Sequence, residues 1–180
     1  MRRAIARHFI NRFSGRYNYD ATYLREMLTV SPTAFFRFAA LSHLARHREA
    51  APVEAYYAAK LVGALFEDCG PCAQLVVEMA REARVADSDI GAVLAGDLAG
   101  ASRNAALGFR FADALTRAAD DLDAARAAVR SAWGDAGVID LTFGTQVGRL
   151  FPMVKRGLGH ASHCERIRVG DRTIRPRRAA

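Results

Sequence analysis

The stretch AAKLVGALFEDCGPC, residues 58–72, decides both the fold and the chemistry that this chain predicts. Its last four residues place Cys69 and Cys72 two residues apart, with Gly70 and Pro71 between them. Two thiols at this spacing can close a small disulfide ring and open it again, which makes a reversible two-electron switch. Pro71 costs no hydrogen bond in the first turn of a helix, and it stiffens the loop that holds the sulfurs together. We therefore predict a redox-active dithiol at the start of a helix.

The residues before the dithiol are typical of a helix rather than a strand. Residues 58–66 are rich in Ala and Leu, and apolar and polar residues do not alternate along them. Cys-Gly-Pro-Cys is also the active-site motif of thioredoxin, but that fold requires a β-strand before the motif and a βαβ pattern around it. A helix, a tight turn with the dithiol and a second helix is a different arrangement, which argues against the thioredoxin fold.

The rest of the chain predicts an all-α fold, a single-domain multi-helix bundle. Alternation with a period of two residues occurs only near residues 166–169. Ser31 and Pro32 are typical of a helix start, Gly134 is the expected end of a helix, and Pro152 is expected to kink or end the last one. The predicted helices cover residues 32–48, 52–68, 70–84, a segment starting at 87 or 88, 105–118, 121–134 and a last one from 135 or 137 to about 152.

The net charge of +7 is unevenly distributed along the chain. The first 50 residues carry +6, residues 51–159 carry −3 and the last 21 carry +4. A nucleic-acid-binding protein more usually shows basic residues along a core element, so we expect solvated basic ends and no nucleic-acid partner. The predicted parts are a basic N-terminal segment at 1–20, a helical domain at 21–158 and a basic, irregular C-terminal tail at 159–180.

Residues 1–19 contain five arginines and no acidic residue. Ile5, Phe9 and Phe13 follow one another at four-residue spacing, which predicts a short basic amphipathic helix. Such a helix usually packs on its own domain or on a partner subunit through the apolar line. Contact with an anionic membrane surface is the alternative interpretation.

Composition limits the class of protein. A chain of 180 residues suffices for one domain with its own core, and three cysteines are too few for a secreted disulfide scaffold. No apolar run reaches the roughly 18 residues that a transmembrane segment needs, and the N-terminus lacks the apolar stretch of a signal peptide. We expect a cytoplasmic protein without a transmembrane segment.

The helix, dithiol turn and following helix resemble the alkylhydroperoxidase D-like branch of the carboxymuconolactone decarboxylase superfamily. The resemblance covers roughly residues 22–158, in the order of helices as well as in the Cys-x-x-Cys motif. It implies an all-α scaffold and a thiol-redox function, either peroxidase-like or disulfide-reductase-like, without a cofactor or metal. The implied partners are a small hydroperoxide or disulfide substrate, a dithiol electron donor and further copies of the chain in a trimer or hexamer.

Two positions depart from the family pattern. Peroxide-reducing members carry a Glu twelve positions before the first Cys and a His four positions after the second, where this chain has Tyr57 and Val76. A peroxidase needs a general acid or base within hydrogen-bond reach of the thiol. The Tyr57 hydroxyl, with a pKa near 10 in the ordinary case, is a poor base, and Val76 cannot replace His.

Nearby residues offer substitutes for this relay. Lys60 and Glu67 share one helix face, where Lys60 would stabilise a thiolate and Glu67 would carry protons. Asp68 is a second carboxylate beside the thiol, and Gln74 could donate a hydrogen bond to a sulfur. The alternative interpretation places all four in solvent. Tyr57, Lys60, Glu67 and the two cysteines are the candidate catalytic residues.

Two arguments assign the attacking sulfur differently. The helix dipole favours Cys69 as an exposed thiolate at the helix start. In the family, His serves the second cysteine, here Cys72, and the first cysteine resolves the intermediate. Since Val76 replaces that His, the sequence favours Cys69 as the more reactive thiol.

Other interpretations stay open. Zinc could be bound by the Cys pair together with His160, His163 and Cys164, and a metal by His43 and His47 four residues apart on one helix. Cys164 could otherwise resolve an intermediate, form an intermolecular disulfide or do neither. The competing function is a non-catalytic helical oligomerisation or binding module that keeps the scaffold, while the decarboxylase-type chemistry of the superfamily does not use a Cys pair.

Overall fold

Helix α4 (Val53–Phe66) runs through the middle of the fold and is buried along most of its length. The computed structural model describes residues 1–163 and 166–177. Small residues let neighbouring backbones approach α4 closely. A methyl group added at Gly108 would collide with the backbone of Ala55, and one added at Gly148 would collide with the carbonyl of Lys60. The core of the molecule is therefore built around α4.

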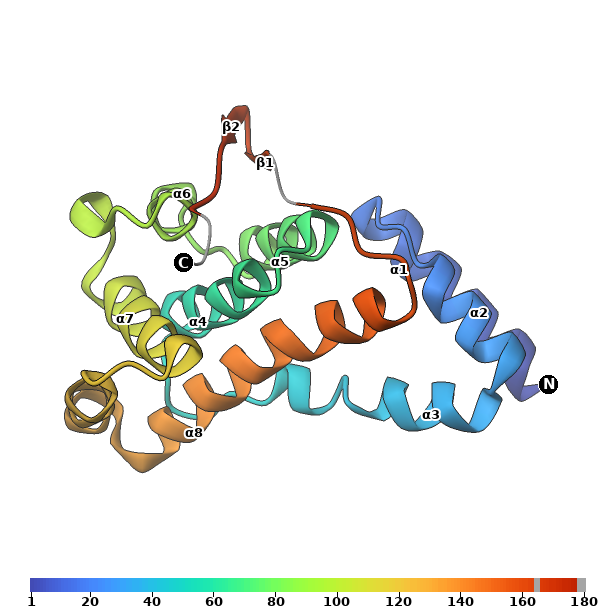
Figure 1. The fold of residues 1–180 in the computed structure, drawn as a ribbon, viewed down its shortest axis with the longest axis horizontal. Coiled ribbons are helices and arrows are strands. Elements are labelled where there is room, and N and C mark those ends of the chain that lie inside the picture. The colour runs from blue at the N-terminus through green and yellow to red at the C-terminus, as the bar shows by residue number, and fades with distance from the viewer. Residues whose placement is uncertain (164–165, 178–180) are drawn as a thin grey trace.

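The described residues form a mostly helical structure with one small sheet (Figure 1), which confirms the all-α class in its coarse sense. The other helices are α1 (Arg2–Tyr17), α2 (Thr22–Val30), α3 (Pro32–Ala40), η1 (Leu44–Arg46), α5 (Gly70–Glu82), α6 (Asp87–Ala95), η2 (Leu98–Gly100), α7 (Arg103–Arg117) and α8 (Leu122–Gly157). Helices α7 and α8 pack on α4, while α1 and α2 lie side by side at one end of the molecule and α6 lies at the other (Figure 1).

Helix α8 joins two predicted helices. Gly134 has a φ of 69° and a ψ of −171°, so the helix bends sharply at the residue where the sequence predicts an end. The sequence predicts that Pro152 kinks or ends the last helix. The helix does not end there, because α8 continues to Gly157. Tertiary packing holds this last part: Lys155 is buried there and contacts the rings of Tyr19 and Tyr23.

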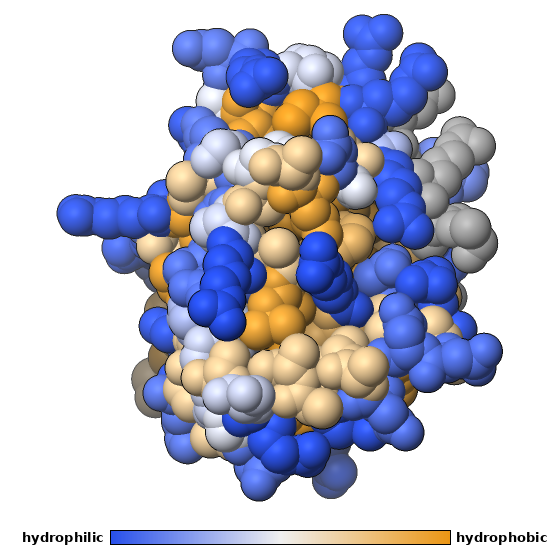
Figure 2. Space-filling view, turned by 90° about the vertical axis from the view of Figure 1, so that its left-hand side faces the viewer, coloured by the Kyte–Doolittle hydropathy of each residue, from blue (hydrophilic) through white to orange (hydrophobic). Residues whose placement is uncertain are grey.

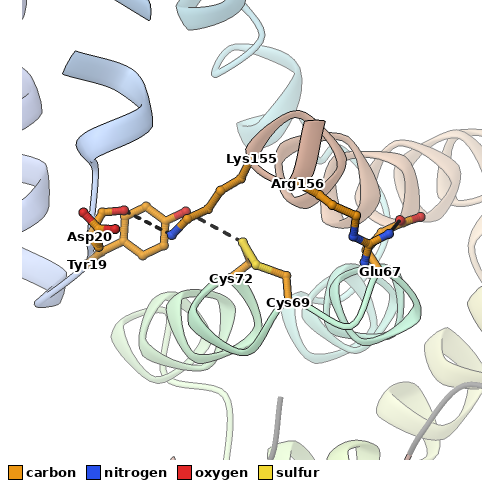
Figure 3. The surroundings of a disulfide bond; sticks show 7 residues. All are labelled: Tyr19, Asp20, Glu67, Cys69, Cys72, Lys155 and Arg156. Carbon is orange, nitrogen blue, oxygen red and sulfur yellow. Dashed lines mark hydrogen bonds and ion pairs between the residues drawn. A yellow bond between two sulfur atoms is a disulfide. The ribbon is translucent and has the colours of Figure 1, made fainter. Parts of the chain in front are cut away.

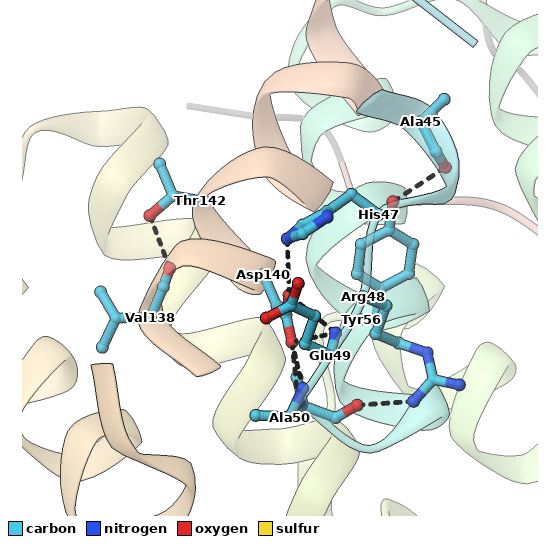
Figure 4. A network of polar contacts seen from close by, with 10 residues as sticks. Ala45, His47, Arg48, Glu49, Ala50, Tyr56, Val138, Asp140 and Thr142 are labelled. Carbon is cyan, nitrogen blue, oxygen red and sulfur yellow. Dashed lines mark hydrogen bonds and ion pairs between the residues drawn. The ribbon is translucent and has the colours of Figure 1, made fainter. Parts of the chain in front are cut away.

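The predicted helix over residues 32–48 is shorter than expected. Ser31 caps it as predicted, accepting the backbone N–H of Ala34, but the helix ends at Ala40. After η1, the carboxylate of Asp140 on α8 holds the chain by accepting the consecutive backbone N–H groups of residues 49, 50 and 51 (Figure 4). His43 and His47 therefore do not share a helix, and His47 lies beside Asp140 instead.

The N-terminal helix packs on its own chain through a different line of residues than the sequence predicts. Ala6 and Ile10 are buried against a cluster that includes Tyr23 and Leu28, whereas Ile5 and Phe9 are 50% and 63% exposed. The predicted helix is confirmed. Of the predicted apolar line, Phe13 packs on this cluster, while Ile5 and Phe9 stay exposed because α2 covers the neighbouring side of α1.

The C-terminal residues form a hairpin rather than an irregular tail. Strands β1 (Ile167–Val169) and β2 (Arg172–Ile174) pair antiparallel around a turn in which Gly170 has a φ of 57°. Ile167 and Val169 are buried in the main core, while the arginines on these strands stay exposed, as expected for solvated charges. None of the helices in the described part of the chain combines the length and apolar content that a membrane crossing requires.

Candidate redox site

The two cysteines meet at the start of α5, as the motif predicts. Cys69 is the N-cap residue, with φ −111° and ψ 96°, and Cys72 lies in the first turn. Their sulfurs form a disulfide, and their Cα atoms are 5.3 Å apart (Figure 3). Gly70 and Pro71 occupy the first two helical positions, where a missing backbone N–H costs nothing.

The sulfur pair is buried, which contradicts the expectation that Cys69 forms an exposed thiolate. Cys69 is fully buried and Cys72 is 4% exposed. The segment that follows α8 runs over the start of α5, where the Ser162 carbonyl accepts the backbone N–H of Gly70 at 3.0 Å. This bond uses one of the helix-start N–H groups that the dipole argument assigned to the thiolate.

Tyr19 contacts Cys72, and Lys155 lies against the ring of Tyr19 (Figure 3). The Tyr19 hydroxyl oxygen is 3.7 Å from Cys72 Sγ, within hydrogen-bond distance for a sulfur partner. Lys155 Nζ lies 4.4 Å from the centroid of the Tyr19 ring and donates a hydrogen bond to the Asp20 carbonyl at 3.2 Å. Residues from three distant parts of the sequence thus meet in one cluster beside the disulfide.

Burial shapes the electrostatics of these groups. It raises the pKa of Tyr19 strongly, and Tyr23 and Asp20 add to the effect, so the Tyr19 hydroxyl keeps its proton. It also lowers the pKa of Lys155, although the carboxylate of Asp20 opposes the shift. Hydrogen bonds from Thr22 lower the pKa of Asp20 itself. The site therefore holds a phenol O–H donor and an amine that gives up its proton more easily than usual.

Glu67 lies on the Cys69 side of the disulfide, at the end of α4 (Figure 3). It is 5% exposed and pairs with two arginines of α8, Arg149 at 2.8 Å and Arg156 at 3.2 Å. The interpretation that places Glu67 in solvent is wrong. Both of its oxygens are engaged, so Glu67 joins α4 to α8 by a paired charge, and a role as proton carrier would require this pairing to open.

Lys60 and Tyr57 meet each other at a different place from the Cys72 cluster. Lys60 Nζ lies 5.7 Å from the ring centroids of Tyr56 and Tyr57 and donates to the Ala45 carbonyl at 3.3 Å. Burial lowers the pKa of Lys60 to about 8 and raises the pKa of Tyr57. Lys60 is 7% exposed, so it is not a solvated charge either.

The remaining candidates near the motif have structural partners. Gln74 exchanges two hydrogen bonds with the backbone of Arg168 and thereby fixes β1 to α5. The Asp68 carboxylate accepts a hydrogen bond from His163 Nδ1 at 2.7 Å. Val76, which stands four positions after Cys72, is buried in the main core. The expectation that Gln74 contacts a sulfur or lies free in solvent is replaced by this backbone pairing.

The residues proposed for zinc are paired elsewhere. His160 contacts Glu26, and His163 contacts Asp68, each at 2.7 Å. The two motif cysteines are bonded to each other, and Cys164 lies outside the described residues. Within residues 1–163 and 166–177, no group of three or more His, Cys, Asp or Glu side chains has the arrangement of a metal site.

Another surface lies away from the disulfide, on the face formed by α6, α7 and the start of α8. Apolar patches alternate there with charged side chains (Figure 2). A shallow depression between α4, α6 and α7 has Phe66 and Phe109 in its lining and Asp113 at its rim. Arg117 and Arg177 both pair with Asp113, so the charges of the rim are largely satisfied.

Sequence reasoning missed Tyr19 and Lys155. One signal was present: the chain has only two lysines among 26 basic residues, and the structure buries both of them, at positions 60 and 155. A lysine kept in a chain that otherwise uses arginine is a candidate for a special role. Comparison with protein-family models, curated proteins and solved structures gives no match to this chain.

Proposed function

We propose that this protein is a thiol-redox protein in which Cys69 and Cys72 cycle between dithiol and disulfide, on a helical scaffold of the alkylhydroperoxidase D-like type. The observation that carries the proposal is the disulfide at the start of α5, with the Tyr19 hydroxyl 3.7 Å from Cys72 Sγ. A hydroxyl donor beside a sulfur stabilises a thiolate there. The family's Glu and His positions hold Tyr57 and Val76, so a working site needs such a donor from elsewhere.

Cys72 is the attacking thiol in this proposal. Its sulfur contacts Tyr19 and is slightly exposed, whereas Cys69 is fully buried. Cys69 then resolves the intermediate. This assignment follows the order in the resembled family and replaces the preference for Cys69 that rests on the helix dipole.

The proposed reaction with a small hydroperoxide has two steps. The Cys72 thiolate attacks the terminal peroxide oxygen; an S–O bond forms, the O–O bond breaks, and the leaving oxygen takes a proton to depart as an alcohol. Cys69 attacks the resulting sulfenic acid, which forms the disulfide and releases water. With a small disulfide as substrate, two exchange steps release two thiols and leave the same protein disulfide.

The electron donor in the proposal is an external dithiol, which reduces the disulfide by exchange and is itself oxidised. Access requires a local opening, because Tyr19 and the segment around Ser162 cover the sulfurs. A cytoplasmic location and a trimer or hexamer belong to the same proposal. Apolar side chains on the surface of α8 support self-association: Ile139, Met153 and Leu158 are about half exposed.

Turnover of tert-butyl hydroperoxide and of oxidised glutathione, with dithiothreitol as donor, tests the function. We expect turnover by the native chain and its loss in Cys72→Ser and Cys69→Ser. Cys164→Ser is the matched control and keeps full turnover. Undiminished turnover in Cys72→Ser would overturn the proposal.

Burial of both sulfurs favours a second candidate, a non-catalytic helical binding or oligomerisation module in which the disulfide is a staple. The two functions predict different reduction potentials. A structural disulfide has a potential below about −300 mV, whereas a cycling pair lies in the range of the cellular dithiol proteins above it. Equilibration with dithiothreitol buffers, followed by thiol trapping, measures the potential. A value below that limit together with no turnover would establish the second candidate.

A further inference from the structure

Tyr19 contacts Cys72 and Lys155 contacts Tyr19, and the two residues come from opposite ends of the chain. Tyr19 lies in the short connection between α1 and α2, and Lys155 lies in the last two turns of α8. The two are 5% and 1% exposed, so water does not screen their interaction with the sulfur. Figure 3 shows the phenol and the amine on the same side of the disulfide, opposite the Glu67 pair.

The environment of Lys155 leaves its charge available for a nearby anion. Its Nζ donates to the Asp20 carbonyl and lies over the rings of Tyr19 and Tyr23, at 4.4 and 5.7 Å from their centroids. Carbonyl and ring contacts compensate a buried ammonium only in part. The Asp20 carboxylate, which is exposed, also acts on this ammonium, and a thiolate at Cys72 would add a second, buried negative charge. The buried lysine is thus better satisfied when Cys72 is ionised than in the disulfide.

We propose that Tyr19 and Lys155 act together as the acid pair of the dithiol. The Tyr19 O–H donates to the Cys72 thiolate, and the Lys155 ammonium behind the Tyr19 ring stabilises the same charge. This inference rests on the proposed redox function and gives that site the proton-handling groups that Tyr57 and Val76 do not supply. Tyr19 touches the reacting sulfur and is the catalytic residue; Lys155 is a positioning residue that acts through it.

The proton path follows from these contacts. When the Cys72 sulfur attacks a peroxide oxygen or a substrate sulfur, its negative charge moves to the leaving atom. The Tyr19 O–H keeps its proton and donates a hydrogen bond to the reacting sulfur before the attack. The leaving alkoxide or thiolate takes its proton from solvent when the site opens.

Other ionisable groups also face this site and enter its titration. They come from the connection before α2, from α2, from the end of α4, and from α8 and the segment behind it: Asp20, Tyr23, Glu67, Arg149, Arg156 and His160. Glu67 is neutralised by its two arginines on the Cys69 side. The net local charge next to Cys72 is therefore dominated by Lys155 and Asp20, and the Asp20 carboxylate is exposed and engaged by Thr22.

The test is an ultraviolet thiolate titration of Cys72 in the full chain with Cys69→Ser and Cys164→Ser, so that one thiol remains. Tyr19→Phe and Lys155→Met are each expected to reduce the thiolate-to-thiol ratio at neutral pH about tenfold, as loss of a hydrogen bond to a charged group implies. Tyr17→Phe and Lys60→Met are the matched controls. Tyr17 donates to Glu82, and Lys60 is the other buried lysine, so both controls leave the titration unchanged.

A purely structural role would lower the melting temperature without moving the titration. Lys155→Arg keeps the charge and is expected to hold the thiolate ratio within about threefold of the parent. Tyr19→Phe keeps the ring that packs on Phe13 and Tyr23, so this variant folds even if Lys155→Met does not. Titrations of Tyr19→Phe and Lys155→Met that match the controls would overturn the inference.

The outcome separates this inference from the proposed function. If turnover depends on the two cysteines but the Cys72 titration does not change in Tyr19→Phe, the redox function is supported and the role of Tyr19 and Lys155 is refuted. If the Cys72 titration depends on Tyr19 and Lys155 but the protein shows no turnover, the role of these two residues is supported and the proposed peroxide and disulfide substrates are refuted.

Discussion

Gly148 of α8 lies directly against the backbone carbonyl of Lys60 on α4. A Cβ atom built on Gly148 falls well inside van der Waals contact with that oxygen and within 3.1 Å of the Ala64 nitrogen. Gly63 on α4 faces the backbone of Thr145 in the same way. These two glycines set the distance between the two helices that carry Lys60, Glu67 and Lys155.

Replacement of Gly148 by Ala should therefore destabilise the protein by at least about 2 kcal/mol, because backbone atoms on both sides cannot move aside. Urea unfolding followed by circular dichroism measures the change. Gly15 on α1 is the matched control, since nothing lies within 4 Å of its added Cβ. Gly15→Ala should stabilise the protein by about 0.5–1 kcal/mol, and an equal loss in both variants would contradict the close helix contact.

Asp140 gives stability that depends on pH. Burial alone would raise the pKa of this carboxyl, but the N–H groups of residues 49–51 and the nearby His47 together hold the pKa below its ordinary value. A depressed folded-state pKa stabilises the protein above the unfolded-state pKa of about 3.9, and the stability is lost as the pH falls through the folded-state pKa.

Asp140→Asn should accordingly cost about 2 kcal/mol at pH 7, with a difference from the native chain that shrinks below about pH 4. Urea titrations between neutral and acidic pH give this difference. Asp97 also accepts one backbone N–H, from Ala99, but in an exposed position. Asp97→Asn should cost less than about 1 kcal/mol. A pH-independent effect at Asp140 would show that shape rather than charge matters there.

The buried Lys60 also makes stability depend on pH, through a lowered pKa of a basic group. Burial lowers its pKa to about 8, so between pH 8 and about 10.4 the unfolded chain binds more protons than the folded one, and stability rises with pH. In Lys60→Met this rise is absent. The stability of the variant relative to the native chain should fall by roughly 3 kcal/mol from pH 7 to about pH 10.5. Denaturation curves of the native chain and of Lys60→Met are compared at each pH, so that the tyrosines, which titrate in both proteins, do not contribute to the difference. A difference in stability that stays constant with pH would refute the buried lysine charge.

Glu67 tests a buried ion pair. In Glu67→Gln, Arg149 and Arg156 lose their carboxylate while the shape of the side chain is kept, and Arg149 is 27% exposed. We expect a loss of about 1–3 kcal/mol, reduced from the fully buried case by the exposure of the arginines. Arg130→Gln, which breaks the exposed pair with Asp135, should stay within about 0.5 kcal/mol. Thermal melts of the two variants make the comparison, and equal melting temperatures would mean that burial adds nothing.

Much of the fold was predictable where local signals agree with packing. Ser31 before Pro32, the Gly-Pro start of α5 and the break at Gly134 all lie where the sequence places them. Helix α2 escaped prediction, because its N-cap residue is Ala21 and no side chain caps it. The C-terminal hairpin was expected as an irregular tail, although residues 166–169 alternate with a period of two. Three residues per strand are too short a pattern to predict a sheet, and Ile167 anchors the hairpin in the core.

The candidate site was predictable only in its cysteines. The Cys69–Cys72 spacing is local, so the sequence shows it directly. Tyr19 meets Cys72 across 53 residues of chain, and Lys155 arrives from the far end of α8; no periodicity encodes such contacts. The same limit applies to His43 and His47, which the sequence places on one helix. Asp140, some 90 residues away, holds the chain between these histidines and α4, and no local pattern encodes that contact.

Because both lysines are enclosed in the folded molecule, lysine-directed reagents become a conformational probe of this protein. A lysine-specific protease should leave the native chain intact and cut it at positions 60 and 155 only when α4 or α8 opens. Acylation of Lys155 alone would report breathing of the region around the disulfide without any need to introduce a label.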